Sequence, residues 1–323
     1  MSHVNTIALI GCSGYAGQVL ATLLAGHPKF ELRVPPSGRA IPGNLATVAA
    51  LGDVDAVALA IPSAAALEWT SILMQTGCRR VLDLSDSHRR EDDVHYALRE
   101  LCGPTPEGAR LVANPGCYPT ATLLALAPLI RGSLVDPSGA CVVGASGASG
   151  AGKGLRDDLH FCHLESNVHP YNVGHHRHRP EIEHHLGAPV SLVTQLLPVA
   201  RGLTITAFVA PRSGVTPADL RACLVEHHAS HPYVHVLDAP DGRLGLKSAV
   251  GSHDAFLAVG PVAHGGHVPV FATIDNLMRG AASQALVALN DWFGFEPSLG
   301  LAAPRDAEAL STPLFAHAHA RTP

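Results

Sequence analysis

A cysteine between a turn and a helix is the first residue in this sequence that could do chemistry. The segment ANPGCYPT, residues 113–120, places Cys117 after a Pro-Gly turn and before Pro119, which suits the first turn of a helix. The positive end of a helix dipole lowers the pKa of a thiol and enriches the thiolate. Most cysteines are small core residues, but a place at the carboxyl end of a strand favours Cys117 as a nucleophile.

A nucleophilic thiol needs a partner that moves protons, and a histidine-rich segment supplies candidates. The stretch NVGHHRHRPEI, residues 172–182, offers three histidines ahead of an expected helix start: His175, His176 and His178. Together with His184 and His185 they are also candidates for a metal site. No thiolate at zinc-like spacing stands nearby in the sequence, and the cation Arg177 lies among the histidines, so we expect acid–base chemistry and no metal.

A glycine turn near the N-terminus indicates a dinucleotide site. Residues 11–17, GCSGYAG, follow the apolar strand expected at residues 6–10 and precede a helix. Glycines let the backbone approach a pyrophosphate, and the helix start favours its negative charge. The next strand, at 30–34, leads to Ser37 and Arg39 instead of the acidic residue that holds a ribose. This favours NADP over NAD; the alternative is that Arg39 is only a solvated loop charge.

A second glycine-rich loop matches the spacing of a P-loop for nucleotide triphosphates. The match runs from Gly147 to Lys153 in GASGASGAGKG, but residue 154 is glycine where magnesium binding requires serine or threonine. We therefore expect this loop to present backbone N–H groups and the hydroxyls of Ser146 and Ser149 to a substrate oxyanion or phosphate.

Two α/β domains are expected to position these residues. Apolar strands alternate with helices over residues 1–116, which predicts a Rossmann-type doubly wound parallel sheet that binds NADP. Residues 117–275 carry a helix to residue 130 and strands near 140–146, 190–198 and 203–210. They predict a second α/β domain with a mixed, largely antiparallel sheet, and because it contains Cys117 we expect it to carry catalysis. A strand at 268–276 leads into a helix at 277–292, so the segment 276–323 is expected to complete the first domain.

Composition narrows the class of protein. The 323 residues are 47% hydrophobic and 15% charged, as in globular proteins, and no apolar stretch is as long as a membrane span. A net charge of −5 with only 22 lysines and arginines argues against nucleic acid as a partner. The first apolar run lacks the flanks of a secretory signal, and the seven cysteines form no Cys-x-x-Cys pair. We expect a cytoplasmic protein with reduced thiols.

Seven motifs follow one another along the chain: GCSGYAG, VLDLS, LVANPGCYPTATLLALAPL, SGASGAGK, GHHRHRPEI, LLPVARG and IDNLMRGAASQALVALN. In this order they resemble the N-acetyl-γ-glutamyl-phosphate reductase family, NADPH-dependent enzymes of arginine biosynthesis related to aspartate-semialdehyde dehydrogenase. They span nearly the whole chain, and NPGCYPT followed by HRHRPEI is the most specific part. The resemblance implies reduction of an acyl phosphate through a cysteine thioester, in a homodimer or homotetramer, with residues 117–275 as the catalytic and dimerisation domain. It implies that Cys117 is catalytic, that His176 is the acid/base, and that Asn276 lies near the nicotinamide.

The expected site residues form two sets around Cys117 and His176. For the cofactor they are Gly11, Ser13, Gly14, Tyr15, Ala16, Gly17, Ser37, Arg39, Pro62, Ser85 and Asn276. For the substrate they are Asn114, Ser146, Ser149, Arg177, His178, Glu181 and Arg201. Arg177 and Arg201 are expected to bind anionic groups of the substrate, because arginine binds carboxylate or phosphate at two points. The alternative is that either of these two arginines is structural.

Two departures from the family pattern leave the acyl group open. The loop from Ser37 to Asp53 and the stretch between LSDSHRR and LVANPGC are both short. The substrate is then N-acetyl-γ-glutamyl phosphate or, in a paralogue, a glutamyl or aminoadipyl phosphate linked to a carrier protein, in a lysine-type or secondary-metabolite pathway. A non-catalytic alternative is a binding module that senses NADPH.

Overall fold

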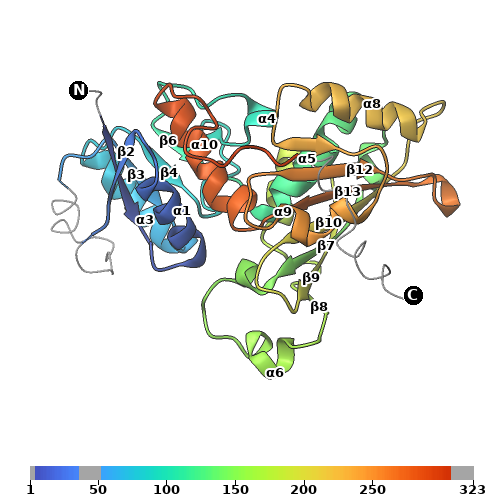
Figure 1. Cartoon of the computed structure of the whole chain (residues 1–323), viewed down its shortest axis with the longest axis horizontal. Coiled ribbons are helices and arrows are strands. Elements are labelled where there is room, and N and C mark those ends of the chain that lie inside the picture. The colour runs from blue at the N-terminus through green and yellow to red at the C-terminus, as the bar shows by residue number, and fades with distance from the viewer. Residues whose placement is uncertain (1–3, 36–51, 307–323) are drawn as a thin grey trace, which may run out of the picture.

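The computed structural model describes residues 4–35 and 52–306 and arranges them around two β-sheets (Figure 1). The first sheet is built from the N-terminal part of the chain and the second from the part that follows Cys117. Helix α10 (Ser283–Trp292) lies between them in Figure 1. No helix in the described ranges is both long enough and apolar enough to cross a membrane.

The first sheet has six strands in the order β2-β1-β3-β4-β6-β5, and all neighbours are parallel. The strands are β1 (Asn5–Ile10), β2 (Phe30–Arg33), β3 (Ala56–Leu59), β4 (Val81–Asp83), β5 (His95–Tyr96) and β6 (Leu111–Ala113). Their carboxyl ends share one edge, where parallel sheets bind ligands. This confirms the predicted doubly wound sheet.

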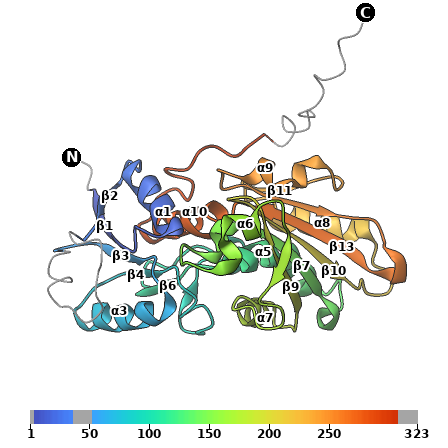
Figure 2. The same cartoon turned by 90° about the horizontal axis from the view of Figure 1, so that it is seen from below.

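Helices cover both faces of this sheet, as its fully apolar strands require. Helices α1 (Tyr15–Ala25) and α10 pack on the face that carries Ile7 and Leu9. Helix α3 (Ser63–Gln75) packs on the face that carries Ala8 and Ile10, and Figure 2 shows α1 and α3 on opposite sides. The short helix α4 (Arg99–Cys102) follows β5. Helix α10 thus returns from the end of the chain to the core of the first sheet.

The second sheet has seven strands in the order β11-β12-β13-β10-β7-β9-β8. They are β7 (Cys141–Gly147), β8 (His169–Tyr171), β9 (Ser191–Leu197), β10 (Leu203–Val209), β11 (Val234–Val236), β12 (Ala255–Val259) and β13 (Val268–Ile274). Only the pairs β7–β9 and β11–β12 are parallel. The prediction of a mixed, largely antiparallel sheet is confirmed.

One face of the second sheet is covered by helices α5 (Cys117–Arg131), α7 (Arg179–Leu186) and α8 (Pro217–His228). On the other face, alternate residues such as Val143, Val193 and Phe208 stay partly exposed. Helix α9 (Leu246–Ala249) lies near the β13 side of that face.

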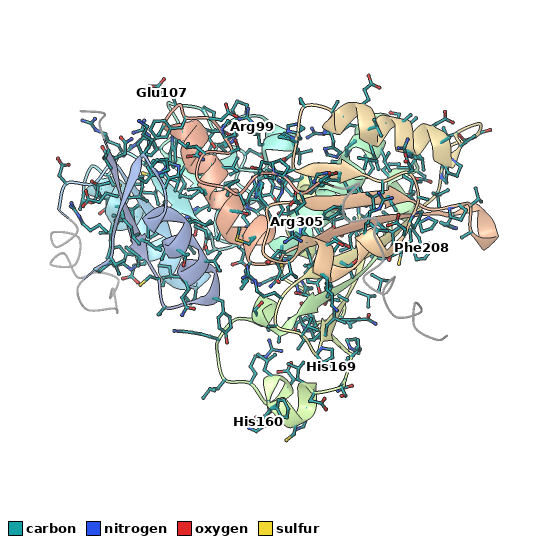
Figure 3. The ribbon with its side chains drawn as sticks, in the orientation of Figure 1. Arg99, Glu107, His160, His169, Phe208 and Arg305 are labelled. Atoms are coloured by element: carbon teal, nitrogen blue, oxygen red, sulfur yellow. The ribbon has the colours of Figure 1, made fainter. Side chains whose placement is uncertain are left out.

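An arm with helix α6 (Phe161–Leu164) projects from the second sheet between β7 and β8 (Figure 1). His160 and His169 mark this arm in Figure 3. Its base returns to the body at Tyr171 and Asn172, which line a small cavity beside Cys117.

Candidate active site

The glycine turn after β1 is closed so tightly that side chains would not fit at two positions. Gly11 has φ +94°, and a Cβ there would lie 2.2 Å from the carbonyl oxygen of Ala60. A Cβ on Gly17 would lie 2.2 Å from the carbonyl oxygen of Gly11. The first N–H groups of a helix have no partner within the helix, so the start of α1 offers donors to a ligand. These features fit a dinucleotide pyrophosphate.

Cys117 is the first residue of α5, at the end of β6, and its surroundings are equally close. A Cβ on the preceding Gly116 would lie 2.6 Å from Nε2 of His178. A Cβ on Gly280 would lie 2.5 Å from Cβ of Cys117. Gly280 belongs to η6 (Met278–Ala282), a π-helical turn that precedes α10. Gly280, from a distant segment of the chain, therefore leaves room for Cys117, and Gly116 leaves room for the ring of His178.

A buried ion pair packs behind the turn at residues 114–117, the cysteine turn, and hydrogen-bonds to its backbone. The carboxylate of Glu181 accepts hydrogen bonds from the Gly116 N–H at 2.9 Å and the Tyr96 hydroxyl at 2.8 Å. It also accepts one from the Arg89 guanidinium at 2.9 Å, and Arg89 donates to the carbonyl of Asn114 at 2.7 Å. Burial acts to lower the pKa of Arg89, but the Glu181 carboxylate and Tyr96 outweigh it and the pKa is raised. The cation and the carboxylate compensate each other in a place that water does not reach.

His176 is held in one orientation and is neutral near pH 7. The His178 backbone N–H donates to Nδ1 of His176 at 3.2 Å, which assigns the ring proton to Nε2. The rings of Tyr118 and Tyr171 stand edge-on to it, with centroids 5.3 and 5.4 Å away. Burial lowers the pKa of His176 to about 4, and Arg177 and His175 act in the same direction. The Nε2–H of the neutral ring is a hydrogen-bond donor.

Two cavities meet at Cys117. The larger, of about 490 Å³, runs from the glycine turn to the cysteine, and the smaller, of about 70 Å³, contains His176. Both are lined by Cys117, Arg177 and His178 and by the glycine loop after β7. A ligand in each would place its reacting atoms at the cysteine.

The predicted low pKa of Cys117 is wrong for this site. Burial raises the pKa of the thiol, although Arg177, the Tyr118 backbone N–H and Arg89 oppose it. The sequence shows that the thiol lies at a helix start, but it does not show the residues that bury it. Here desolvation by burial raises the pKa more than the helix start lowers it.

The predicted cofactor residues gather around the larger cavity. Its lining includes seven of them: Gly14, Tyr15, Ala16, Gly17, Pro62, Ser85 and Asn276. Gly11 and Ser13 belong to the same turn without lining the cavity. Asn276 is fixed by hydrogen bonds to the Gly202 N–H at 2.8 Å and to the Ser149 hydroxyl at 2.9 Å. Ser37 and Arg39 lie outside the described residues.

The predicted substrate residues divide into two groups. Arg177 and His178 line both cavities, Ser149 lines the larger and Ser146 the smaller. Three others line neither: Asn114, Glu181 and Arg201. Glu181 and Asn114 are buried against Arg89.

Arg201 makes a structural ion pair and lines neither cavity. Its guanidinium lies 3.0 Å from Asp275, which is fully buried and accepts backbone hydrogen bonds from Leu277 and Gly251 at 2.8 and 2.7 Å. This pair fixes the turn between β13 and η6.

Several site residues were not identified from the sequence. Arg89 and Asp86 follow β4, and Asp86 lies 3.5 Å from Arg177. Lys153 lines the larger cavity, and Tyr171 and Asn172 line the smaller. Arg89 and Asp86 stand in the segment LSDSHRR, beside the VLDLS motif. In the ranges that the structure describes, no group of three histidine, cysteine or acidic side chains could hold a metal ion.

Comparison with known proteins shows the family to which the chain belongs. Residues 117–276 match the family described as semialdehyde dehydrogenase, dimerisation domain. An N-acetyl-gamma-glutamyl-phosphate reductase of Salinispora arenicola is 37% identical over 332 residues, covering 92% of this chain and 97% of the relative. One from an Arthrobacter species is 36% identical over 337 residues, with the same coverage.

Solved structures share the fold at lower identity. Aspartate semialdehyde dehydrogenase II of Vibrio cholerae superposes with a TM-score of 0.68 at 15% identity, covering 91% of this chain and 99% of that one. The aspartate semialdehyde dehydrogenase of Candida albicans, solved with NADP, gives 0.64 at 17% identity, covering 90% and 98%. The chain therefore belongs to the semialdehyde dehydrogenase family of enzymes, in the branch of the N-acetyl-gamma-glutamyl-phosphate reductases.

Proposed function

We propose that this enzyme reduces an acyl phosphate to an aldehyde with NADPH, and that its substrate is N-acetyl-γ-glutamyl phosphate, an intermediate of arginine biosynthesis. The observation that carries the proposal is the position of Cys117 where the two cavities meet. The names of relatives at 37 and 36% identity support the choice of substrate.

In the proposed reaction Cys117 attacks the acyl carbon, the bond from that carbon to the phosphate oxygen breaks, and a thioester forms. The cofactor, when bound, supplies the hydride that turns the thioester into a thiohemiacetal. Collapse of the thiohemiacetal breaks the carbon–sulfur bond and releases the aldehyde and the cysteine. Because burial raises the pKa of Cys117, its thiol must lose a proton before or during the attack on the acyl carbon.

His176 is proposed to donate a hydrogen bond from Nε2 to the oxygen of the acyl group and to stabilise the negative charge that this oxygen carries in the tetrahedral intermediates. Its neutral state supports this role, because the ring keeps a donor while Nδ1 accepts from the backbone. His176→Asn should slow the reaction roughly 10²- to 10³-fold, the usual effect of removing one hydrogen-bond donor to an oxyanion. His175→Asn, whose ring is exposed, is the matched control and should retain activity.

The preference for NADPH rests on Ser37 and Arg39, together with a solved relative that carries NADP. Arg39 would bind the 2′-phosphate through a charge-assisted contact. We expect kcat/KM to be higher with NADPH than with NADH, and Arg39→Ala to reduce that ratio. Equal kcat/KM values with both coenzymes would reject the assignment.

Arg177 is proposed to bind an anionic group of the substrate. Its side chain is 56% exposed, lines both cavities and lies 3.5 Å from Asp86. A substrate carboxylate or phosphate would replace Asp86 in this pair, because a guanidinium can bind either at two points. Arg177→Met should therefore raise KM more than it lowers kcat.

The test of the reaction runs it backwards, because acyl phosphates are unstable. Aldehyde, phosphate and NADP⁺ are mixed with the enzyme, and the absorbance of NADPH is followed. We expect activity with N-acetylglutamate semialdehyde and none with aspartate semialdehyde. Cys117→Ser should abolish turnover and leave NADPH binding intact, whereas Cys162→Ser, on the exposed helix α6, should retain turnover.

A panel of carrier-linked aldehydes separates the two substrate classes. If only a carrier-linked aldehyde reacts, the acyl-phosphate reduction through Cys117 still holds, but N-acetyl-γ-glutamyl phosphate is rejected as the substrate. Binding of NADPH without turnover of any aldehyde would favour the sensing module.

A homodimer is proposed through the second sheet. The matched family is described as a dimerisation domain over residues 117–276. The face of that sheet opposite α5 carries half-exposed residues such as Val143, Val193 and Phe208, an area suited to a second copy. Sedimentation of the wild type and of Phe208→Asp should show a dimer and a weakened dimer respectively.

A further inference from the structure

Lys153 crosses from the second sheet to the glycine turn of the first. It follows the loop after β7, and its ammonium lies 3.0 Å from the carbonyl oxygen of Ser13 and 3.1 Å from the Ser13 hydroxyl. Ser13 and Lys153 are 140 residues apart in the chain. The chain has only three lysines, and the other two, Lys29 and Lys247, line neither cavity. This contact therefore puts a rare residue at one end of the larger cavity.

The positive charge of Lys153 is not compensated by a carboxylate in the described parts of the chain. Arg177 also crosses the larger cavity, but it faces the carboxylate of Asp86 at 3.5 Å. Lys153 faces only a carbonyl and a hydroxyl, which are neutral. The start of α1, with its unpaired N–H groups, lies in the same lining. Lys153 and the N–H groups at the start of α1 thus both direct positive charge into the larger cavity.

The loop that carries Lys153 is fixed at one end and open at the other. At the fixed end the Ser149 hydroxyl accepts from Asn276 at 2.9 Å, and a Cβ on Gly150 would lie 2.7 Å from the Ser146 hydroxyl oxygen. Beyond it, Gly152 has φ +81° and no atom within 4 Å of its Cβ position, and Gly154 is equally open. The lysine side chain is exposed. It has room to leave Ser13 for a nearby anion.

We propose that Lys153 binds the pyrophosphate of the dinucleotide cofactor and exchanges its contact with Ser13 for it. The proposal rests on the proposed function, which supplies a dinucleotide as ligand. An ammonium and the N–H groups of α1 would then hold the pyrophosphate from both halves of the molecule. Because Ser149 and Gly150 belong to the same loop and lie beside Cys117, cofactor binding would also fix the loop at the reacting end.

Dissociation constants measured by the quenching or transfer of protein fluorescence test this role without turnover. Lys153→Met should raise the Kd of NADPH and of NADH by the same factor, roughly 10- to 100-fold for a lost charge-assisted contact. Lys153→Arg keeps the charge and should stay within about threefold of wild type. Lys247→Met makes the same charge change at an exposed site away from the cavities and should change neither Kd.

Chemical modification gives an independent readout, because three lysines are easily resolved by peptide mass spectrometry. Reductive methylation with and without saturating NADPH should show protection of Lys153 and equal modification of Lys29 and Lys247. Lack of protection at Lys153, with a Kd unchanged in Lys153→Met, would overturn the proposal.

Two other outcomes would also overturn it, by assigning Lys153 to a different anion. A loss confined to NADPH would place Lys153 at the 2′-phosphate. An unchanged Kd with a raised KM for inorganic phosphate in the reverse reaction would place it at the substrate phosphate. If wild-type enzyme binds neither NADPH nor NADH, the proposed reductase function is rejected. If wild type binds both and Lys153→Met binds them equally well, only the role of Lys153 is rejected.

Discussion

Two helix starts in this molecule have nearly the same backbone and different surroundings. Gly14 before α1 has φ −78° and ψ 160°, and Gly116 before α5 has φ −78° and ψ 163°. Behind the first lie the glycine turn and the carbonyl of Ala60. Behind the second lies the buried group of Glu181, Arg89 and Tyr96. A helix start offers N–H donors in both cases, so the chemistry at each depends on what packs against it.

The largest expected effect comes from removing the charge behind the cysteine turn. Glu181→Gln leaves the Arg89 cation buried without its carboxylate, so the free energy of unfolding should fall by about 3–5 kcal/mol. Glu183→Gln, on the same helix but partly exposed, should cost under about 1 kcal/mol. Urea unfolding of both variants measures the difference. Equal stability of the two variants would mean that the ion pair does not hold the turn.

The two glycines provide a matched pair of substitutions. A Cβ on Gly116 would meet His178 at 2.6 Å, whereas the nearest atom to a Cβ on Gly14 lies at 3.5 Å. Gly116→Ala should destabilise the protein by about 1–3 kcal/mol through overpacking and reduce kcat. Gly14→Ala should leave stability within about 1 kcal/mol and act on cofactor affinity. If Gly14→Ala proves the more destabilising, the comparison of the two turns is wrong.

Acid should lower the free energy of unfolding, because His176 is buried in its neutral form. The pKa of His176 in the folded protein is about 4, below the unfolded value of 6.5, so the unfolded chain takes up the proton first as the pH falls. Stability is therefore full above about pH 6.5 and declines towards pH 4, with about 2 kcal/mol lost by pH 5 from this group. In His176→Asn the difference in urea unfolding between pH 7.5 and pH 5 should shrink by that amount. An unchanged pH dependence would show that His176 does not titrate as described.

The smallest effect concerns the reactivity of Cys117. Since burial raises the pKa of its thiol, the rate of alkylation by iodoacetamide should keep rising with pH up to at least pH 9. Peptide mapping follows Cys117 and the exposed Cys162 in one experiment. A plateau for Cys117 near pH 7 would indicate that the helix start dominates after all.

The first sheet and the two turns could be predicted because their signals are local. Strands such as β1 are apolar runs next to glycine or proline, and the glycines of the first turn stand at the spacing that close packing requires. The helix after β13 was predicted over residues 277–292, but it begins as the π-helical turn η6, which has no sequence period. Strands β5 (His95–Tyr96) and β8 (His169–Tyr171) are short and contain no aliphatic residue, so no apolar run marks them in the sequence.

The long-range pairs in the site could not be predicted. Arg89 finds Glu181 across 92 residues, and Arg201 finds Asp275 across 74. Each is a charged residue whose partner is determined by the fold, so the sequence favoured a substrate-binding role for Arg201 and did not show its partner Asp275. The division at residues 116 and 117, the roles of the site residues and the reading of Ser37 and Arg39 stay predictions.

Cys117 is proposed to hold the acyl group as a thioester at the point where the two cavities meet. Incubating the enzyme with N-acetylglutamate semialdehyde and NADP⁺ without phosphate tests it directly, because the aldehyde is oxidised on the cysteine and the thioester has no phosphate to release it. We predict one NADPH formed per chain and a matching acyl adduct on the Cys117 peptide, removed by added phosphate and absent in Cys117→Ser. An adduct on another residue, or the same burst from Cys117→Ser, would show that Cys117 does not carry the acyl group.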